Sequence, residues 1–178
     1  MYPVSAILFS VVDTGAWSLD QLRTWADRLI EERPHSPLWL LDLSTSRSLQ
    51  EASSAISRGL KDAQIMLPDD MGDLLVGFFA LRFQRGQLDA RQFAAAVGDV
   101  LDAYGSSRLN VEQWNLLTSH GEEVTGALRA VTDELARAAA ASEDRLRQLD
   151  SLATGLARWD GSEGAELRMF RLTTPPRW

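Results

Sequence analysis

Few residues in this chain could do acid–base or metal chemistry. It has two histidines, His35 and His120, and no cysteine, so disulfides, thiolate catalysis and cysteine-ligated zinc are excluded. A di-iron bundle needs the Glu-x-x-His pattern on two helices; this spacing occurs once, at Glu32 and His35, and Pro34 interrupts it. The glycines form no phosphate-binding, dinucleotide-binding or nucleophile-elbow motif. We therefore expect no catalytic residue, no cofactor and no metal site.

The carboxylates offer the remaining candidates for chemistry. Asp99 and Asp102 stand three residues apart in a predicted helix, and Asp69, Asp70 and Asp73 surround the start of the helix before it. Such groups could line a metal or acid–base site. Helix capping and solvated helix faces explain acidic residues at these places better, and we favour that interpretation.

Tryptophan is the second feature that could mark function, because its large side chain anchors either a core or an interface. Trp25, Trp39 and Trp114 sit among periodic apolar neighbours and are predicted to lie in the core. Trp17 lies in a predicted turn and Trp159 at a predicted helix end, where partial exposure at a contact surface is an alternative to burial. The candidate protein-contact residues are therefore Trp17, Asp99, Asp102 and Trp159.

The chain carries a net charge of -7, and its acidic excess runs through its N-terminal, central and C-terminal parts alike. Binding to nucleic acid or to an anionic membrane needs clustered positive charge, so neither is expected, whereas a basic protein partner fits. The apolar run at residues 4–12 is too short to cross a bilayer and lacks the positive residues that open a secretory signal. We therefore expect a cytoplasmic protein.

The elements that would hold these residues are predicted to be helices. Residues 74–83 are apolar on nearly every side, as in a helix enclosed by others. Acidic residues before this run and arginines after it match a helix dipole, although a buried strand has the same short apolar signature. Gly86 ends the run. Asp89 and Gln92 then form a capping box, and a second helix continues to residue 104, before Gly105.

The N-terminal part repeats this arrangement at an offset of 71 residues, since residues 15–22 match residues 86–93. Each copy has a glycine, an apolar residue, a cap residue, Gln three positions after the cap, and then a large apolar side chain. The match favours a helix over a strand for residues 4–12 and predicts two helical hairpins, at about residues 4–32 and 70–104. A true internal repeat and chance similarity of common capping sequences both remain open.

The rest of the pattern is also helical. We predict an amphipathic helix at residues 18–32, one or two docked turns at 38–43, a helix from the capping box of Ser48 and Glu51 to about residue 64, and a short helix after Asn110. Residues 122–159 contain no proline and repeat apolar residues in steps of three and four. One straight helix of this length would span about 55 Å. We therefore expect a kink or break near residues 140–143, with Ser142 capping the second segment.

Together these elements predict an all-α protein, a helical bundle built from helical hairpins plus a long, broken C-terminal helix. At 178 residues, the chain is expected to form a single helical domain over residues 1–172. We expect a short strand or coil at residues 167–172 and a loosely ordered tail at residues 173–178.

Two segments, Trp25-Ala-Asp-Arg-Leu-Ile-Glu-Glu32 and Pro37-Leu-Trp-Leu-Leu-Asp-Leu-Ser44, resemble a pattern found in small helical bacterial proteins of unknown function. Some of these have been proposed as toxin-immunity proteins. The resemblance consists mostly of core and loop positions and supplies no catalytic residue. It implies a helical fold and a bacterial cytoplasmic location more than an activity.

We therefore expect a non-enzymatic protein-binding module, with an inhibitor or immunity protein for a basic toxin as its specific form. One alternative is a small-molecule-binding protein or enzyme with a pocket between the hairpin at residues 70–104 and the C-terminal helix, which would be marked by polar groups from Asp99, Asp102 or His120. Another is an oligomerising structural protein, in which residues 122–159 pair with a second copy of themselves.

Overall fold

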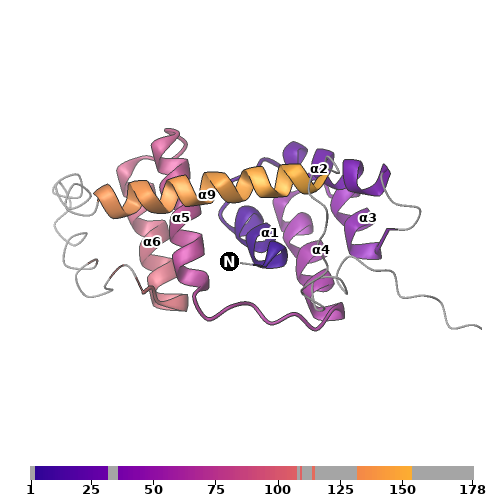
Figure 1. The fold of residues 1–178 in the computed structure, drawn as a ribbon, viewed down its shortest axis with the longest axis horizontal. Helices are drawn as coiled ribbons and strands as arrows, with labels where there is room; N and C mark the ends of the chain where they lie inside the picture. Colours follow the sequence, from indigo (N-terminus) through magenta and orange to yellow (C-terminus); the bar gives the residue numbers. More distant parts are fainter. Residues whose placement is uncertain (1–2, 32–35, 108, 110–113, 115–131, 154–178) are drawn as a thin grey trace, which may run out of the picture. The chain divides into compact units, whose positions relative to one another are not determined.

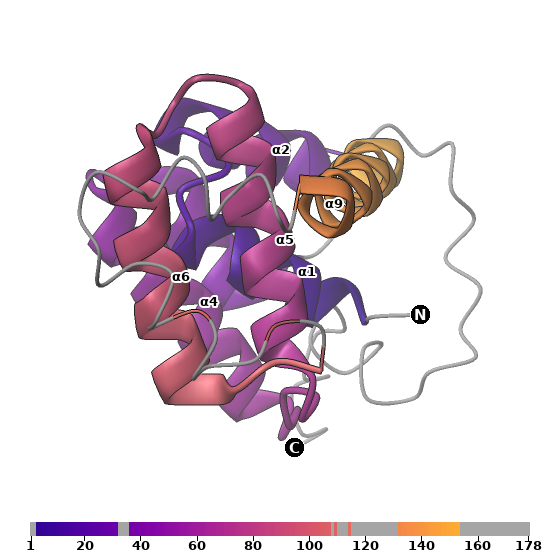
Figure 2. The ribbon, with the colours of Figure 1, turned by 90° about the vertical axis from the view of Figure 1, so that its left-hand side faces the viewer.

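The computed structural model describes residues 3–31, 36–107, 109, 114 and 132–153. This part of the chain forms seven helices and no strand, and Figure 1 and Figure 2 show the helices from two sides. The helices are α1 (Val4–Asp13), α2 (Leu19–Glu31), α3 (Leu38–Thr45), α4 (Leu49–Asp62), α5 (Met71–Gln84), α6 (Ala90–Tyr104) and α9 (Thr132–Ala153). The predicted all-α class is confirmed, and helices at residues 4–12 and 74–83 exclude the strand alternatives.

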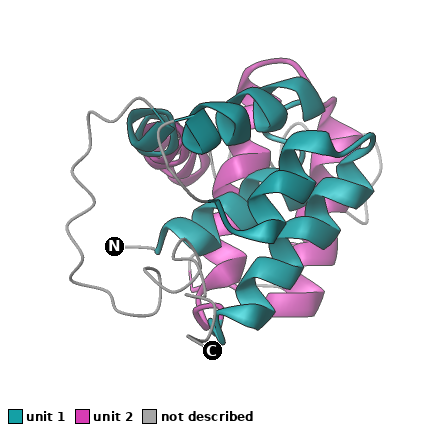
Figure 3. Ribbon diagram, turned by 90° about the vertical axis from the view of Figure 1, so that its right-hand side faces the viewer, with its two compact units in different colours: residues 1–66, 147–178 teal, residues 67–146 magenta. Residues whose placement is uncertain are grey.

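The chain divides into two compact units, coloured separately in Figure 3. Unit 1 comprises residues 1–66 and 147–178, and unit 2 comprises residues 67–146. Helix α9 supplies residues to both, because Leu146 belongs to unit 2 and Arg147 to unit 1. The prediction of one domain over residues 1–172 stays a prediction. The predicted helix start at Asn110, the strand or coil at 167–172 and the tail at 173–178 lie outside the described residues.

In unit 1, helix α2 packs against α3, α3 against α4, and α1 against α4. The predicted hairpin at residues 4–32 is therefore wrong in its packing, since α1 and α2 each lie mainly against other helices. The turn between two helices sets where the second begins, but apolar faces decide which helices pack. Helices α3 and α4 approach closely at Gly59 of α4, where a Cβ would lie 2.7 Å from Cγ of Trp39 on α3. The missing side chain leaves room for the indole ring.

In unit 2, helices α5 and α6 lie side by side (Figure 2) and form the predicted hairpin. Every residue of α5 from Met71 to Phe78 is buried, in agreement with its continuous apolar sequence. On α6, Phe93 stacks on Phe83 of α5 with ring centroids 4.8 Å apart, and it meets the ring of Trp114 edge-on at 6.0 Å. Aromatic side chains thus join α5, α6 and the segment at Trp114.

Helix α9 is continuous from Thr132 to Ala153, so the break predicted at residues 140–143 is wrong. Ser142 is a fully buried residue in the middle of the helix and does not cap it. A Cβ on Gly77 of α5 would come within 2.5 Å of the Ser142 hydroxyl oxygen and 3.1 Å of the Ala138 carbonyl oxygen. The apolar spacing lapses here because only small side chains fit between helices this close. The remainder of the predicted seam at 122–159 lies outside the described residues.

Three helices end in the same hydrogen-bonded turn. Gly15, Gln64 and Gly86 follow α1, α4 and α5 with φ of 65°, 55° and 68°. The N–H of each donates to the carbonyl three residues back, and the next N–H donates to the carbonyl five residues back, at 2.9–3.1 Å. These are the two bonds of the Schellman motif. The motif at Gln64 lies outside the two matching segments, residues 15–22 and 86–93. The same turn can therefore arise without an internal repeat, and the similar turns at Gly15 and Gly86 are no evidence for one.

The helices that follow Gly15 and Gly86 also begin alike. The N–H of Ser18 donates to Oε1 of Gln21 at 2.8 Å, and the Ser18 hydroxyl accepts from the Gln21 N–H at 3.3 Å. Asp89 and Gln92 exchange the same two bonds at 3.0 and 2.8 Å. The predicted capping box of Asp89 and Gln92 is confirmed, and Ser18 and Gln21 form the same arrangement. At α4 the predicted capping box is only half formed. The Ser48 hydroxyl accepts from the Glu51 N–H at 3.1 Å, but the Glu51 carboxylate accepts from the N–H of Arg47, at 2.7 Å, instead of that of Ser48.

We expect Gln64→Gly to stabilise the protein. Gln64 is exposed and holds a left-handed backbone conformation that a side chain disfavours and glycine adopts freely. The gain in free energy of unfolding should be about 0.5–1 kcal/mol, since glycine also has more freedom in the unfolded chain. Thermal unfolding should show a Tm rise of about 1–4 °C.

The matched control for Gln64→Gly is Gly86→Ala. In the part of the chain that the structure describes, no atom lies within 4 Å of a Cβ built on Gly86, so the expected effect there is one of the backbone. This variant should lose about 1 kcal/mol. A lower Tm for Gln64→Gly than for the wild type would contradict the assignment of a strained cap.

The first turn of α5 holds the chain segment that follows α6. A Cβ on Gly72 would overlap the carbonyl oxygen of Gly105 and lie 2.9 Å from its carbonyl carbon. The buried carboxylate of Asp73 accepts hydrogen bonds from the hydroxyls of Ser106 and Ser107 and from the Ser107 N–H, the last at 3.0 Å. We call this set the α5 clasp. It joins residues 33 and 34 positions apart in the sequence.

Candidate functional site

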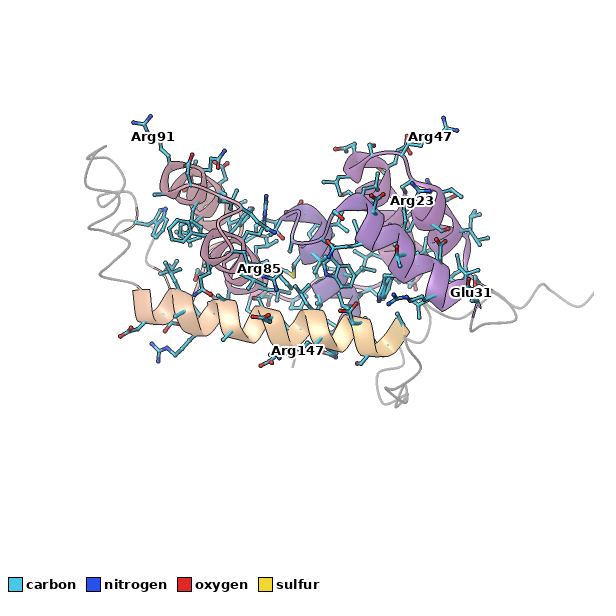
Figure 4. All side chains as sticks on the ribbon, turned by 90° about the horizontal axis from the view of Figure 1, so that it is seen from above. Arg23, Glu31, Arg47, Arg85, Arg91 and Arg147 are labelled. Carbon is cyan, nitrogen blue, oxygen red and sulfur yellow. The ribbon has the colours of Figure 1, made fainter. Side chains whose placement is uncertain are left out.

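Asp99 and Asp102 are both exposed on α6. Residues three apart on a helix are neighbours, so the two carboxylates repel each other. Asp102 lies in the last turn, which contains no basic residue, and the helix dipole disfavours an anion there. The one basic residue of α6, Arg91, is about 12 Å from Asp99 along the helix axis and extends away from the helix in Figure 4. The two carboxylates thus oppose the electrostatics of their own helix.

Asp13 repeats the unfavourable position at the end of α1. Partial burial disfavours its charged form and raises the pKa of its carboxyl. Because the folded pKa lies above the unfolded one, this group weakens the fold at neutral pH. The penalty declines as the pH falls through the folded pKa and is gone below the unfolded pKa.

The three tryptophans that were predicted to lie in the core are buried, and this prediction is confirmed. Trp25, Trp39 and Trp114 have 2%, 3% and 3% of their surface exposed. Trp17 is also buried, at 5%, and its ring lies 6.2 Å from that of Trp25 at a tilt of 51°. Replacing Trp17 would therefore disturb folding as well as any binding surface. Trp159 lies outside the described residues.

The aspartates at the start of α5 separate into two kinds. Asp69 and Asp70 are exposed, whereas Asp73 is buried in the α5 clasp with three hydrogen bonds. Within the described ranges, no three His, Asp or Glu side chains are grouped so that they could hold a metal ion. His35 and His120 lie outside those ranges.

A shallow hollow of about 270 Å³ lies in unit 1 between α2 and the end of α9. We call it the α2–α9 hollow. Its lining residues are Trp17, Asp20, Gln21, Thr24, Trp25, Arg28 and Asp150. The Nε1–H of Trp25 donates to the carbonyl of Leu149 at 2.8 Å, and this bond holds the two walls of the hollow together. The hollow thus has two indoles in its lining and carboxylates from both helices.

The charged groups of the α2–α9 hollow are not paired with one another. Asp20, Arg28 and Asp150 are exposed, and the ion pairs established among the described residues lie elsewhere. Those pairs join Arg58 to Asp42, Arg85 to Glu143 (Figure 4 labels Arg85), and Arg137 to Glu134. The hollow therefore presents two carboxylates and one guanidinium to an occupant.

Sequence reasoning drew attention to Trp17 but missed the hollow. Asp20 and Arg28 follow the polar spacing of an ordinary solvated helix face. Asp150 is 130 positions from Asp20, and no local pattern indicates that the end of α9 lies beside α2. The hydrogen bond of Trp25 to the Leu149 carbonyl, which links the two helices, has no signature in the sequence.

No protein-family model matches the chain, and neither a characterised protein nor a solved structure is significantly similar to it. The resemblance to small helical bacterial proteins therefore stays a hypothesis. No described helix combines the length and the apolar character that crossing a membrane would need.

Proposed function

We propose that the protein works by binding another protein, with a basic surface, in the cytoplasm of a bacterial cell. An inhibitor or immunity protein for a basic toxin is the specific form of this proposal. No catalytic step and no cofactor are part of it.

The observation that carries the proposal is the placement of Asp99 and Asp102. Two neighbouring carboxylates lower the stability of their helix by about 0.2–0.5 kcal/mol, and an anion in the last turn lowers it by about 0.3–1 kcal/mol more. Neither residue has an ion-pair partner in the part of the chain that the structure describes. Among the described residues no ion pair draws on these charges, whereas a basic partner would be attracted to them.

The two alternative functions find less support. Where Gly77 of α5 faces α9, an added Cβ would meet the Ser142 hydroxyl oxygen at 2.5 Å, which leaves no space for a ligand at that point. The apolar stripe of α9 is buried within the chain, at Leu135, Ala138, Leu146 and Leu149. Pairing of two copies through this stripe would first have to expose it.

The proposal is tested by capturing the tagged full-length protein from lysate of its native host. We expect one abundant basic protein in stoichiometric amount. Asp99→Asn/Asp102→Asn should lower the affinity of the purified complex by about tenfold at low salt. Raising the salt concentration should also lower the affinity of the wild-type complex, because salt screens the same charges. The Tm of this variant should equal or exceed that of the wild type, so that lost binding cannot be lost folding.

Asp62→Asn/Asp69→Asn is the matched control. It removes two exposed carboxylates, one of which also ends a helix, and so makes the same change in net charge. It should retain the partner. Capture of no basic protein, or equal loss of binding in both double variants, would overturn the proposal or its assignment to α6.

A further inference from the structure

We propose that the α2–α9 hollow receives a single arginine side chain of the basic partner. This inference rests on the proposed function. It assigns to the partner a second contact region, which lies in unit 1. The first, the acidic face of α6, lies in unit 2.

The size of the hollow fits one side chain. Pockets for small molecules usually enclose about 300–1,000 Å³ and cover most of the ligand. The α2–α9 hollow, at about 270 Å³, lies below that range and is open to solvent. A side chain inserted from a protein surface would fill it while its backbone stays outside.

The charges favour a cation in the hollow. Asp20 comes from α2 and Asp150 from α9, so the two carboxylates approach the hollow from different walls. Arg28 lies two helical turns beyond Asp20, about 12 Å along the axis, and cannot neutralise both. A carboxylate without an ion-pair partner can accept two parallel hydrogen bonds from a guanidinium, which lysine cannot supply.

The floor of the hollow suits the rest of an arginine side chain. Trp17 and Trp25 are almost wholly buried, and the Trp25 N–H is already bonded to Leu149. They therefore offer an occupant only the small exposed parts of their side chains, and the Trp25 N–H is not among the free donors. Arginine packs its methylene stem on apolar surface and keeps its charged end at the polar rim. Thr24 supplies one further hydroxyl at the wall.

The first experiment titrates the full-length protein with the peptide acetyl-Gly-Arg-Gly-amide and with its citrulline counterpart, which has the same shape without the charge. Binding is followed through the indole N–H signals of Trp17 and Trp25 in ¹⁵N NMR spectra. We expect both signals to shift with the arginine peptide. The citrulline peptide should bind at least about tenfold more weakly, because it loses the charge-assisted hydrogen bonds.

Asp20→Asn and Asp150→Asn should each lower the affinity for the arginine peptide by about tenfold, whereas Asp99→Asn should leave that affinity unchanged. All three variants replace an exposed carboxylate and should keep the wild-type Tm. Equal binding of both peptides, no binding, or unchanged affinity in Asp150→Asn would overturn the inference. Agmatine binding as tightly as the peptide would identify a site for small cations instead, and growth of the solution mass would identify a second copy as the occupant.

The captured complex separates failure of this inference from failure of the proposed function. If Asp20→Asn/Asp150→Asn retains the partner fully while Asp99→Asn/Asp102→Asn loses it, the hollow is not a contact but the proposed function stands. If no basic partner is captured while the arginine peptide still binds at Asp20 and Asp150, the proposed function fails and the hollow remains a cation site.

Discussion

Gly72→Ala should destabilise the protein by about 3 kcal/mol, because its Cβ would overlap the backbone of Gly105. Alanine normally improves a helix by about 1 kcal/mol relative to glycine. Here the Cβ would lie 1.7 Å from the carbonyl oxygen of Gly105 and 2.9 Å from its carbonyl carbon. Neither atom can move without shifting the chain that the α5 clasp holds, and overpacking of this kind costs about 1–3 kcal/mol or more. Thermal unfolding should show a Tm lower by about 6–12 °C.

Gly98→Ala is the control for this prediction. Gly98 is a helical glycine of α6 in the same unit, and among the described atoms its Cβ would meet Nε1 of Trp114 alone, at an ordinary 3.9 Å. The change should therefore raise the stability by up to about 1 kcal/mol. If Gly72→Ala proves as stable as Gly98→Ala, the close approach of α5 to Gly105 is wrong.

Asp73→Ala should lower the free energy of unfolding by about 2–3 kcal/mol. The substitution removes a buried acceptor of three hydrogen bonds and leaves the donors of Ser106 and Ser107 without it. Hydrogen bonds to a charged group contribute about 1.5–3 kcal/mol, and stranded donors add a further penalty. Urea unfolding measures the loss, and faster amide exchange at Ser107 would localise it.

Two variants place limits on the Asp73 result. Asp73→Asn keeps the shape but can offer only one acceptor oxygen, so its loss should be smaller than that of alanine. Asp69→Ala removes an exposed carboxylate nearby and should change stability by less than about 0.5 kcal/mol. A clasp without energetic importance would make Asp73→Ala and Asp69→Ala indistinguishable.

The features that could be predicted from the sequence are local ones. The capping boxes at Ser18 and Asp89 involve partners three residues apart, and the breaker glycines Gly15 and Gly86 act on their immediate neighbours. Burial of Trp25 follows from the spacing of one helix face. Such signals are contained within one helix or turn, so they survive whatever the rest of the chain does.

The features that were missed depend on contacts between distant segments. The lapse in apolar spacing at Ser142 predicts a helix break when α9 is considered alone, and it indicates close packing only when Gly77 is known to lie opposite. The α5 clasp and the α2–α9 hollow each bring together side chains from separate helices or loops. Asp99 and Asp102 could be identified as exposed acidic residues. No local sequence pattern distinguishes a carboxylate that binds a partner from one that contacts only solvent.

The distribution of tryptophan makes the two units optically distinct. Trp114 is the sole tryptophan in the sequence of unit 2, where its ring meets Phe93 and its N–H donates to the Ala94 carbonyl at 3.2 Å. Trp17, Trp25 and Trp39 all belong to unit 1. A chain that keeps only Trp114, with phenylalanine elsewhere, would emit from unit 2 alone, and one that lacks only Trp114 would emit from unit 1. Comparing their fluorescence during unfolding would reveal whether the units lose structure together or one after the other.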